Sequence, residues 1–527
     1  MPDVIVIGGG HNGLVTASLL AKSGLKSLVL ERTDRIGGCA RTSALAPGFR
    51  CPTLSHAAAI DPSIVRALAL ERHGLHMIRP AADVCAPTLN GRALTLWSEP
   101  ARAAEEIRAW SAKDAAQYPR FLDSFARVSG VLRGLLGSAP PSIDDPTAGD
   151  LIDLLKTGRQ FRALGKTDAY RLIRWMPMAV ADFAGEWFES EPLRATIATG
   201  GILGSFLGPW SAGSTAVLLL LGAGEGRPVA NGWFAKGGTG AVADALAAAA
   251  REAGVEIRTN ADVAQVDVDS NGAAAGVTLA SGEQIAARAV ASAVDPKRTL
   301  LRLVDPIHLA PEVVRRVQNI RAHGTLAKIN YAVSSLPRFT GVSDTAALSG
   351  RIRLARDIDS VERAFDAAKY GGFADEPWIE LTIPSLTDSF LAPPGAHVIS
   401  AYVQYAPYHL RGTTWDAERD RLGDAATRTV GRYAPGFESS VVQREVMSPL
   451  DLERDYGLTG GHIFHGELAL DQWFVTRPLL GFARYATPIP NLYLCGSGAH
   501  PGTGLDGRSG QLAAKEIIRA LRSTSRR

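Results

Sequence analysis

Residues 4–14 read VIVIGGGHNGL, and this stretch decides the fold. Four apolar residues of strand type run directly into a glycine-rich turn, and a helical pattern of apolar residues follows. Gly8, Gly10 and Gly13 stand at the spacing G-x-G-x-x-G. In this setting the first glycine permits a tight turn, the second lets the backbone approach a pyrophosphate, and the third lets the helix pack on the strand. The stretch therefore predicts a dinucleotide-binding strand, turn and helix, with the phosphates at the helix N-terminus.

An acidic residue closes the second predicted strand. Residues 28–30 form a short apolar run that ends at Glu31. A carboxylate at this place can accept hydrogen bonds from ribose hydroxyls and would repel a 2′-phosphate. We therefore expect Glu31, together with the adjacent Arg32, to bind the cofactor.

Two more segments have the character of the same α/β unit. Residues 237–240 read GGTG and precede a helix rich in Ala and Leu, after which strand-like runs recur up to residue 294. Near the C-terminus, a strand at 492–495 leads into a glycine-rich loop and a helix from about residue 508. Two long insertions separate these segments. The sequence therefore predicts a nucleotide-binding domain assembled from discontinuous pieces, with a second domain built from the insertions.

The insertions contain both kinds of regular structure. Residues 100–135 and 150–225 are expected to be mainly helical. Strand-like runs occur at 326–333, 378–383 and 397–405. The second domain is therefore expected to combine helices with a sheet.

The composition is that of an ordinary globular protein. The chain has 527 residues, of which 46% are hydrophobic and 21% are charged, and its formal net charge is +3. The hydrophobic and charged fractions exclude a disordered or coiled-coil chain. Because basic and acidic residues are nearly equal in number, the net charge gives no general attraction to nucleic acid. Four cysteines occur without a C-x-x-C pair and no metal-ligand spacing stands out, so neither a metal site nor a disulfide framework is expected. Because no signal peptide precedes the first strand, we expect a cytoplasmic protein.

One long uncharged segment raises the question of whether the chain crosses a membrane. No charged residue occurs between Arg194 and Glu225, which is a length that could cross a bilayer. Glycines and Pro209 interrupt the segment, however, and only residues 216–221 are densely aliphatic. We predict that residues 195–224 are buried as a helix pair or as the wall of an apolar cavity, and we expect no transmembrane span. Peripheral membrane contact and a homodimer are left open.

Two glycine-containing stretches resemble elements of a known superfamily. Residues 34–42 read DRIGGCART, and residues 492–507 read LYLCGSGAHPGTGLDG. Both resemble flavin-contacting elements of the flavin amine oxidase superfamily, and with the first motif they cover nearly the whole chain in the expected order. The chain is most similar to the phytoene-desaturase-related branch and, within it, to the group named pyridine nucleotide-disulfide oxidoreductase domain-containing protein two. Leu505-Asp506 departs from the smaller residues that are usual in the branch.

The resemblance implies an architecture and a set of cofactor residues. It implies an α/β fold in which a Rossmann-type FAD-binding domain, formed by residues 1–75, 230–300 and 480–527, carries an inserted α+β substrate domain with an antiparallel sheet, formed by residues 76–229 and 301–479. FAD is the implied cofactor. Besides the residues already named, the implied cofactor-binding residues are Gly37, Gly38, Arg41, Val263, Gly496, Gly504, Leu505 and Asp506.

The resemblance also implies an activity. It points to an FAD-dependent oxidoreductase that oxidises or desaturates a largely apolar small molecule by transferring a hydride to the flavin. The phytoene-desaturase branch suggests polyene or isoprenoid substrates, whereas amine oxidases suggest amines, and the sequence does not choose. Two alternatives remain: a flavin-dependent isomerase of a polyene-type substrate, and a non-catalytic lipid- or partner-binding protein on the same fold.

Lys328 lies in an apolar run, residues 326–333, that reads LAKINYAV. On a strand, side chains alternate between faces, so Lys328 and Asn330 share the face opposite Ile329 and Tyr331. One interpretation is a solvated outer face. The other follows from the resemblance to amine oxidases, in which a lysine on the matching strand holds a water beside the flavin, and where an ammonium would stabilise the reduced flavin. Lys328 is therefore a candidate catalytic residue.

Four histidines are candidates for the cavity. His462 and His465 flank an apolar pair and either line the substrate cavity or serve as structural residues, and we treat His465 as the second candidate catalytic residue. His500 lies in the C-terminal flavin loop, so we expect it near the ring without a covalent link. His56 is a further candidate to face the flavin.

Overall fold

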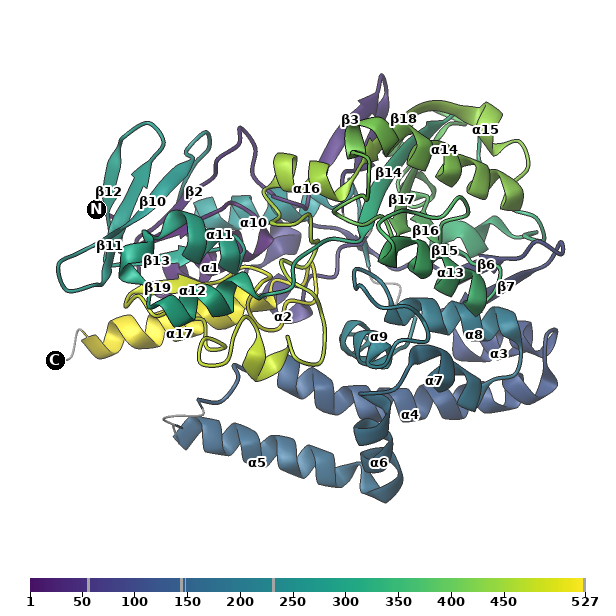
Figure 1. The fold of residues 1–527 in the computed structure, drawn as a ribbon, viewed down its shortest axis with the longest axis horizontal. Coiled ribbons are helices and arrows are strands. Elements are labelled where there is room, and N and C mark those ends of the chain that lie inside the picture. Colours follow the sequence, from purple (N-terminus) through teal and green to yellow (C-terminus); the bar gives the residue numbers. More distant parts are fainter. Residues whose placement is uncertain (55–56, 143–145, 147, 230–232, 525–527) are drawn as a thin grey trace.

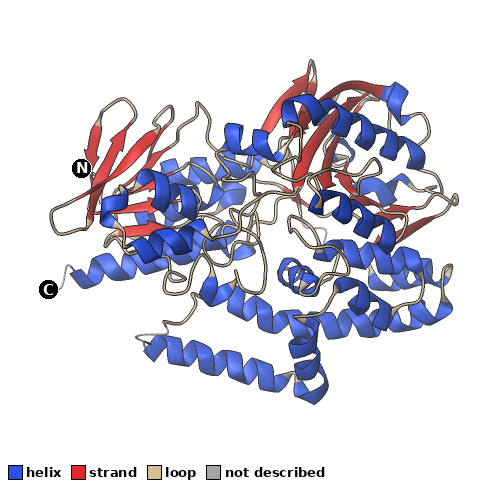
Figure 2. Cartoon of the chain, in the orientation of Figure 1, coloured by secondary structure: helices blue, strands red, loops and turns tan. Residues whose placement is uncertain are grey.

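The computed structural model describes residues 1–54, 57–142, 146, 148–229 and 233–524, which form two bodies side by side (Figure 1). Sheets occupy the core of each body, and a layer of helices lies below the second one (Figure 2). The strands are β1 (Val4–Ile7), β2 (Ser27–Leu30), β3 (Thr42–Ala46), β4 (Phe49–Pro52), β5 (Met77–Ile78), β6 (Ala82–Pro87), β7 (Ala93–Trp97), β8 (Phe234–Ala235), β9 (Glu256–Arg258), β10 (Val263–Val268), β11 (Ala274–Leu279), β12 (Gln284–Ala286), β13 (Ala289–Ser292), β14 (Leu326–Val333), β15 (Arg351–Leu354), β16 (Ile379–Thr382), β17 (His397–Gln404), β18 (Val441–Met447) and β19 (Leu492–Leu494). The helices are α1 (His11–Lys22), α2 (Pro62–Ala67), α3 (Pro100–Arg108), α4 (Ala112–Leu136), α5 (Ala148–Ala163), α6 (Gly165–Trp175), α7 (Val180–Trp187), α8 (Glu191–Ala198), α9 (Ser214–Gly222), α10 (Gly240–Glu252), α11 (Pro296–Arg298), α12 (Pro311–Gln318), α13 (Ile358–Lys369), α14 (Trp415–Tyr433), α15 (Phe437–Ser440), α16 (Pro449–Tyr456) and α17 (Arg508–Thr524).

A five-stranded parallel sheet forms the centre of the first body, in the order β19-β13-β1-β2-β9. Its strands come from three distant stretches of the chain, which confirms the predicted discontinuous nucleotide-binding fold. The strands are apolar throughout because both faces of the sheet are covered. Val4 and Val6 pack in one core with residues of α1, α10 and α17. Ile5 and Ile7 face the opposite side and pack with residues of β10 and β11.

The second layer on this sheet reaches further along the chain than predicted. The antiparallel sheet β10-β11-β12 covers the face opposite the helices. Leu303, Leu309 and Val317 belong to the same core. The predicted domain boundary at residue 300 therefore falls inside a packed unit, because the apolar side of α12 is buried against the cofactor body.

A seven-stranded sheet forms the second body, in the order β18-β14-β17-β16-β15-β6-β7. Its pairs are antiparallel except for β15 and β6, which run parallel. Ala327, Ile329 and Tyr331 on β14 pack into the largest apolar core, against the helical layer and α14. Lys328 and Asn330 point to the other face, and both are buried, with exposed fractions of 0% and 1%. The predicted alternation is confirmed, and the solvated interpretation of the Lys328 face is wrong.

Most of the uncharged segment 195–224 is buried, although Phe206 and Trp210 are 41% and 44% exposed. It forms the end of α8, an irregular stretch and α9, and Val217 and Leu219 of α9 are fully buried. Gly200 and Leu203 line the cavity described below, so the segment is both a buried helix pair and a cavity wall, as predicted. Among the described helices, none combines the length and the apolar composition that a bilayer crossing requires.

The insertions differ from the prediction in two details. The predicted helix over 100–135 is divided into α3 and α4, because Ser111 begins a new helix by accepting a hydrogen bond from the Asp114 backbone N–H. The strands β6, β7, β15 and β18 were not expected from the sequence. β15 reads RIRL, and its alternation of arginines with apolar residues hides a strand whose polar face is largely buried. β18 reads VVQREVM, and three consecutive polar residues interrupt its apolar pattern.

Candidate functional site

A cavity of about 290 Å³ lies where the two bodies meet. The turn after β1 and the ends of β2 and β10 form one wall, and residues from α9, β15 and β17 form the other. The volume is roughly twenty times what a single water needs, so the cavity has room for an extended ligand. The predicted site residues that line it are Gly8, Gly10, Gly13, Glu31, Arg32, Gly38, Arg41, Val263, His465, Gly504 and Leu505.

The glycine-rich turn leaves open space at the N-terminus of α1, where a bound phosphate is expected. Gly10 caps this helix with an extended backbone, and a Cβ built on it would meet no atom within 4 Å. A Cβ on Gly13 would instead lie 2.1 Å from the Gly8 carbonyl oxygen. Gly10 therefore opens towards the cavity, whereas Gly13 allows the close contact of helix and turn. This geometry fits a pyrophosphate held by the helix N-terminus.

Glu31 stabilises the turn as well as facing the cavity. Its Oε2 accepts a hydrogen bond from the Gly9 backbone N–H at 2.9 Å. Its Oε1 accepts from the backbone N–H and the hydroxyl of Thr33, at 3.0 and 2.9 Å. A carboxylate has about four acceptor sites, so capacity remains for a ribose hydroxyl. The side chain is only 7% exposed, which makes these contacts difficult to replace with water.

Arg41 carries a buried nitrogen that has no acceptor among the residues that the structure describes. Its Nη2 donates to the Thr33 hydroxyl and to the Arg35 carbonyl, at 2.6 and 2.7 Å, whereas its Nε has no partner. Leaving a buried donor unpaired costs about 1–3 kcal/mol or more for a charged group. Arg32 and Arg298 line the same part of the cavity. These cations and the unpaired Nε fit the diphosphate of the dinucleotide that the sequence predicts.

The C-terminal loop contributes both lining and supporting residues. Gly504 and Leu505 line the cavity, and Leu505 packs against Ala40. Asp506 lies behind them: its Oδ1 accepts from the backbone N–H of Arg508, the first residue of α17. Burial raises the pKa of the Asp506 carboxyl. Its position indicates that it supports the loop rather than contacting a ligand.

Two predicted cofactor glycines are packing positions. A Cβ on Gly496 would lie 2.3 Å from the Ala293 carbonyl oxygen, where β19 passes β13. A Cβ on Gly37 would lie 2.7 Å from the Ala40 carbonyl oxygen, and Gly37 has a φ of +111°. Both glycines let backbone segments meet beneath the cavity, and neither is part of the cavity wall formed by the described residues.

Two histidines meet in the cavity. His465 is half-buried, its backbone is left-handed with a φ of 57°, and its buried Nδ1 has no partner among the described residues. His11 follows the glycine-rich turn, and its Nε2 lies 3.2 Å from the Gly504 carbonyl oxygen. Burial, with a contribution from His465, lowers the pKa of His11 to about 4, and burial also lowers the pKa of His465. Both rings are therefore neutral at pH 7 and can accept hydrogen bonds.

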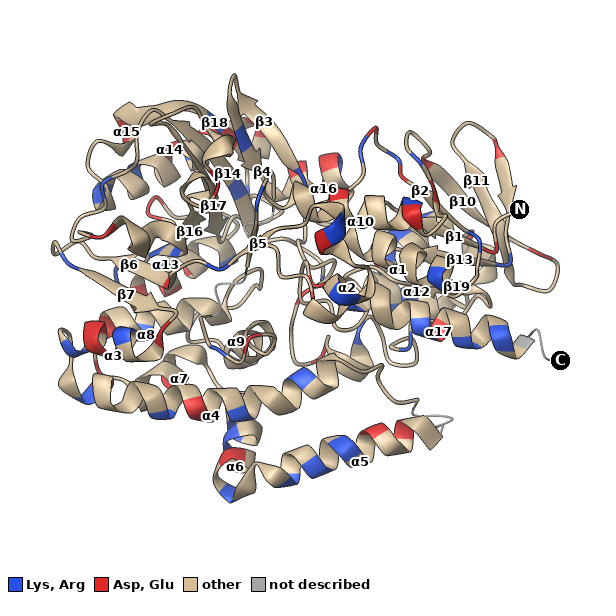
Figure 3. Cartoon of the chain, turned by 180° about the vertical axis from the view of Figure 1, so that it is seen from behind, with Lys and Arg blue, Asp and Glu red and all other residues tan. Residues whose placement is uncertain are grey.

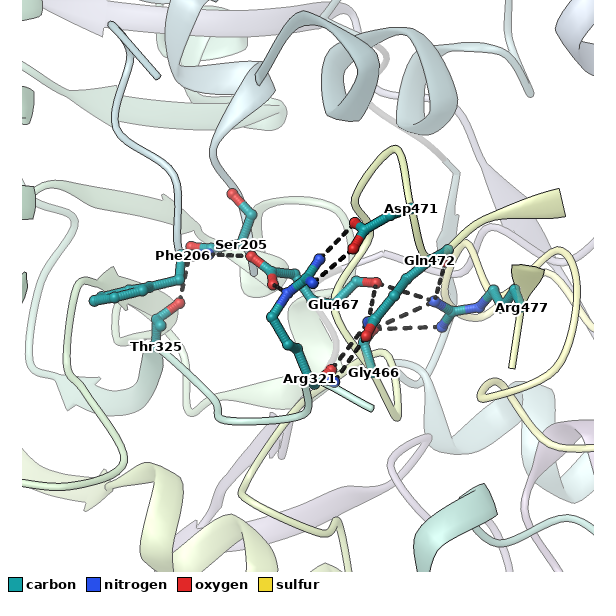
Figure 4. Close-up of polar contacts among 9 residues, drawn as sticks. All are labelled: Ser205, Phe206, Arg321, Thr325, Gly466, Glu467, Asp471, Gln472 and Arg477. Carbon is teal, nitrogen blue, oxygen red and sulfur yellow. Dashed lines mark hydrogen bonds and ion pairs between the residues drawn. The ribbon is translucent and has the colours of Figure 1, made fainter. Parts of the chain in front are cut away.

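Arg477 fixes the loop that carries His465 (Figure 4). Its guanidinium is buried, and its Nη2 donates to the carbonyls of Phe464 and Ser497 at 2.7 and 2.8 Å. Its Nη1 donates to the carbonyl of Glu467 at 3.2 Å. One side chain thus joins the His465 loop to the C-terminal loop. Burial lowers the pKa of Arg477 to about 10, so it stays charged at neutral pH.

The same loop is tied to the opposite cavity wall through Glu467 (Figure 4). Its Oε1 accepts from the Phe206 backbone N–H at 3.0 Å, and its Oε2 accepts from Arg321 Nε at 2.8 Å. Arg321 also forms two 2.7 Å contacts with Asp471. Residues on the 195–224 segment and on the His465 loop are therefore held at a fixed separation across the cavity.

Lys328 lies on the cavity-facing side of the seven-stranded sheet, behind the surface of the cavity. Arg353, Glu380, Tyr402 and Lys328 stand directly opposite one another on β15, β16, β17 and β14, so their side chains share one face. Arg353 and Tyr402 line the cavity, whereas Lys328 does not. Lys328 Nζ donates to Asn330 Oδ1 and Ser400 Oγ at 2.5 and 2.6 Å. Burial lowers the pKa of Lys328 to about 8.

The other histidines singled out in the sequence lie elsewhere. His462 is buried behind the loop, where its Nδ1 accepts from the Phe464 backbone N–H at 3.2 Å. His500 packs against Phe474, with its Nε2 3.2 Å from the Leu135 carbonyl oxygen, and it does not reach the cavity wall as described. Burial lowers the pKa of both to about 3. His56 lies outside the described residues.

Sequence reasoning missed several residues of the cavity. His11 stands inside the quoted first motif, where attention to side chains as well as glycines would have found it. Tyr402, Arg351 and Arg353 belong to strands with no recognised motif, and no signal in the sequence marks them. They reach the cavity only because the sheet brings β15 and β17 to its edge.

Comparisons with known proteins identify relatives over the full length. The family described as flavin containing amine oxidoreductase matches residues 180–518, and the NAD(P)-binding Rossmann-like domain matches residues 6–68. The chain is 37% identical to pyridine nucleotide-disulfide oxidoreductase domain-containing protein 2 of Rattus norvegicus, over 99% of this chain and 94% of the relative. It is 27% identical to a phytoene desaturase (lycopene-forming) of Pantoea ananas, over 98% of each chain. The fold resembles cyclohexylamine oxidase from Brevibacterium oxydans, with a TM-score of 0.57, 19% identity and 99% of each chain covered.

Proposed function

Because this chain belongs to the flavin-containing amine oxidoreductase family and is an FAD-dependent oxidoreductase, we propose that it oxidises or desaturates a largely apolar small molecule. The observation that carries the proposal is the shared cavity. Its first wall holds Gly10, Glu31 and Arg41, and its second wall holds Leu203, Leu221 and Ile463 together with aromatic residues. A cofactor on the first wall and an apolar molecule on the second would meet near the middle of one cavity.

The protein's own residues support three parts of such a reaction. Bound FAD supplies the acceptor for a hydride from a substrate C–H bond. The turn at Gly10 and the cations Arg32 and Arg41 bind its diphosphate, while Leu203 and Phe464 exclude water from the substrate side. The neutral rings of His11 and His465 offer nitrogen atoms that can accept a hydrogen bond from the substrate.

Lys328 is proposed as a positioning residue. Its Nζ lies 5.6 Å from the centre of the Tyr402 ring, and Tyr402 lines the cavity. A charge behind this ring stabilises negative charge that develops in the cavity during the reaction. Its pKa of about 8 places the loss of the Nζ proton within the range in which enzymes are assayed.

The test combines cofactor analysis with anaerobic reduction. Purified protein should release FAD on denaturation. Amines, polyenes and unsaturated acids are then added to the holoprotein without oxygen, and bleaching of the flavin absorbance identifies a substrate. A protein that holds FAD, is never bleached and converts a polyene into its isomer would instead be the isomerase. A protein that binds lipid and cannot be reconstituted with FAD would be the non-catalytic carrier.

We also propose that the α5–α6 hairpin, residues 148–175, contacts an anionic lipid surface. Leu151, Ile152 and Leu155 on α5 are 53%, 52% and 73% exposed, and Asp150 is the one residue of this helix that is buried. Figure 3 shows basic residues along the same helix. The exposed basic residues of the hairpin include Lys156, Arg159, Arg162 and Lys166. Apolar side chains beside cations match the chemistry of an anionic membrane surface, from which an apolar substrate can be taken up.

Vesicle sedimentation tests this contact. The holoprotein should sediment with vesicles of phosphatidylcholine mixed with phosphatidylglycerol, and much less with phosphatidylcholine alone. Leu155→Ser should reduce sedimentation, whereas Ile307→Ser, which changes an 83% exposed residue elsewhere, should not. If size-exclusion chromatography shows a dimer that Leu155→Ser dissociates, the hairpin is a homodimer interface and the lipid proposal is wrong.

A further inference from the structure

We infer that the substrate carries a carboxylate, which Arg351 and Arg353 bind at the far end of the cavity. This inference rests on the proposed function and specifies the substrate class. Both arginines are on β15, two residues apart, so their side chains lie on the same face of the strand. Both line the cavity together with Gly200 and Pro228, and a Cβ built on Gly200 would lie 3.6 Å from Arg353 Nη1.

The two arginines share one buried acid. Arg353 Nε donates to Glu380 Oε2 at 2.8 Å, and Arg351 Nη1 donates to Glu380 Oε1 at 3.1 Å. The Arg353 and Glu380 side chains are 4% and 0% exposed. Arg353 Nη1 also donates to the Thr196 carbonyl at 2.6 Å. The Arg351, Arg353 and Glu380 side chains therefore sum to one positive charge at this part of the cavity wall.

Arg351 has donor capacity that no described residue uses. Its Nε is buried and has no partner, although its side chain as a whole is 17% exposed. A buried cation in excess and an unpaired donor are both unfavourable unless an anion completes the site. An arginine guanidinium matches the planar fork of a carboxylate, which can accept two parallel hydrogen bonds.

The position of the arginines also sets the shape of the substrate. Arg353 and Tyr402 share one row of side chains on strands separated by β16, which places them about 10 Å apart at the usual strand spacing. Leu203, Leu221 and Ile463 line the same cavity. A molecule with an apolar body and a terminal carboxylate would therefore present its body to Tyr402 and its anion to β15.

Glu225 is the nearby acid that opposes this inference. It lines the cavity, is solvent-exposed, and makes an interaction of its own. Its carboxylate would repel a bound anion rather than attract it. If the inference is right, Glu225→Gln should bind a carboxylate at least as tightly as the parent protein. Weaker binding by this variant would contradict the assignment of the site.

The test compares two probes of the same shape that differ in charge. 4-Phenylbutyrate and 4-phenylbutanamide are titrated into the FAD-loaded protein by calorimetry. We expect the carboxylate to bind more tightly, and Arg351→Gln to weaken it by about tenfold to hundredfold, as expected for a lost charge-assisted hydrogen bond. Binding of the amide should change by less than about twofold.

A matched control removes a positive charge from the same segment without touching the cavity. Arg356 pairs with Asp357 at 3.2 Å, and its side chain is 46% exposed. Arg356→Gln should leave the binding of both probes unchanged. FAD content and thermal melting show whether each variant is folded, and Arg351→Lys, which keeps the charge, should recover part of the binding.

Three results would overturn the inference: no carboxylate binding at millimolar concentration, equal affinity for the two probes, or an equal loss of both probes in Arg351→Gln. The proposed function fails separately, if no compound of any class bleaches the flavin although the carboxylate binds. If uncharged compounds bleach the flavin and the carboxylate has no advantage, the oxidoreductase proposal stands and the carboxylate site is wrong.

Discussion

Lys328 and Tyr402 stand opposite each other on the neighbouring antiparallel strands β14 and β17, and Lys328 Nζ lies 5.6 Å from the centre of the Tyr402 ring. The ring faces the cavity and the ammonium lies behind it. A cation at this distance from an aromatic ring is attracted by the electron-rich face. The charge of Lys328 therefore contributes to the electrostatic potential in the cavity, although the Lys328 side chain does not line the cavity.

Replacing Lys328 by Met should slow flavin chemistry without releasing FAD. The substitution roughly preserves the length of the side chain and removes its charge. We expect flavin reduction by substrate, or reoxidation by oxygen, to slow by at least about tenfold, which is about 1.4 kcal/mol of barrier. Stopped-flow absorbance measures both half-reactions. Lys369→Met, at a partly exposed position on α13, is the control and should leave both rates unchanged. Unchanged rates in Lys328→Met would remove Lys328 from the mechanism.

The rates should also depend on pH through Lys328. Burial lowers its pKa from 10.5 to about 8, so Nζ is charged below pH 8 and neutral above it. The affected step should therefore slow as the pH rises through 8 in the parent protein, and Lys328→Met should lack this inflection. Between pH 8 and 10.5 the unfolded chain binds more protons than the folded one, so this group makes stability rise with pH across that window. A pH profile that is identical in the variant would contradict the assignment.

Gly10→Val should abolish FAD binding while the protein remains folded. The new side chain would extend into the open space where the pyrophosphate is expected, and Gly10 has a φ of −73°, which valine can adopt. Gly13→Ala is the contrasting variant, because its Cβ would lie 2.1 Å from the Gly8 carbonyl oxygen and force α1 away from the turn. We expect a lower melting temperature for Gly13→Ala and a nearly unchanged one for apo Gly10→Val. Retention of FAD by Gly10→Val would exclude this turn as the phosphate site.

Glu31→Ala should weaken both FAD retention and the turn itself. One charge-assisted hydrogen bond to a ribose hydroxyl contributes about 1.5–3 kcal/mol, so retention should fall without being lost. The backbone N–H groups of Gly9 and Thr33 would lose their acceptor, which lowers the stability of the apo protein as well. Dilution of the holoprotein followed by filtration measures FAD release. Release of FAD at the parent rate would show that Glu31 stabilises the turn and does not bind the cofactor.

Arg477→Met should disorder the His465 loop. The buried guanidinium donates to the carbonyls of Phe464, Glu467 and Ser497, and these would lose their donor. Because hydrogen bonds to charged groups contribute about 1.5–3 kcal/mol each, we expect a loss of several kcal/mol and faster proteolysis within this loop. Arg316→Met is the control, since this half-buried guanidinium donates to the Leu480 carbonyl and not to the carbonyls of Phe464, Glu467 and Ser497. If the loop resists proteolysis as in the parent protein, Arg477 does not hold it.

The local features of the cofactor side could be predicted because each depends on neighbours in the chain. The run VIVI and the spacing of Gly8, Gly10 and Gly13 define a strand, a turn and a helix by local geometry. The alternation around Lys328 likewise predicts two faces on β14. The alternation does not predict which face of the strand is exposed to solvent. That depends on what covers the sheet, and here the polar face is buried too.

The sequence by itself determined the nucleotide-binding sheet and the largely buried character of residues 195–224, because glycine spacing and apolar periodicity act over a few residues. The family and the cofactor follow from the resemblance of residues 34–42 and 492–507 to flavin-contacting elements of a known superfamily. Only the tertiary structure decided which side chains meet. Lys328 is 74 residues from Tyr402 in the chain and opposite it in the sheet, and Glu31 and Arg353 reach one cavity from different bodies. Contacts across a sheet depend on strand order and register, and a shared cavity depends on how the two bodies pack. No local pattern of residues in the chain predicts either.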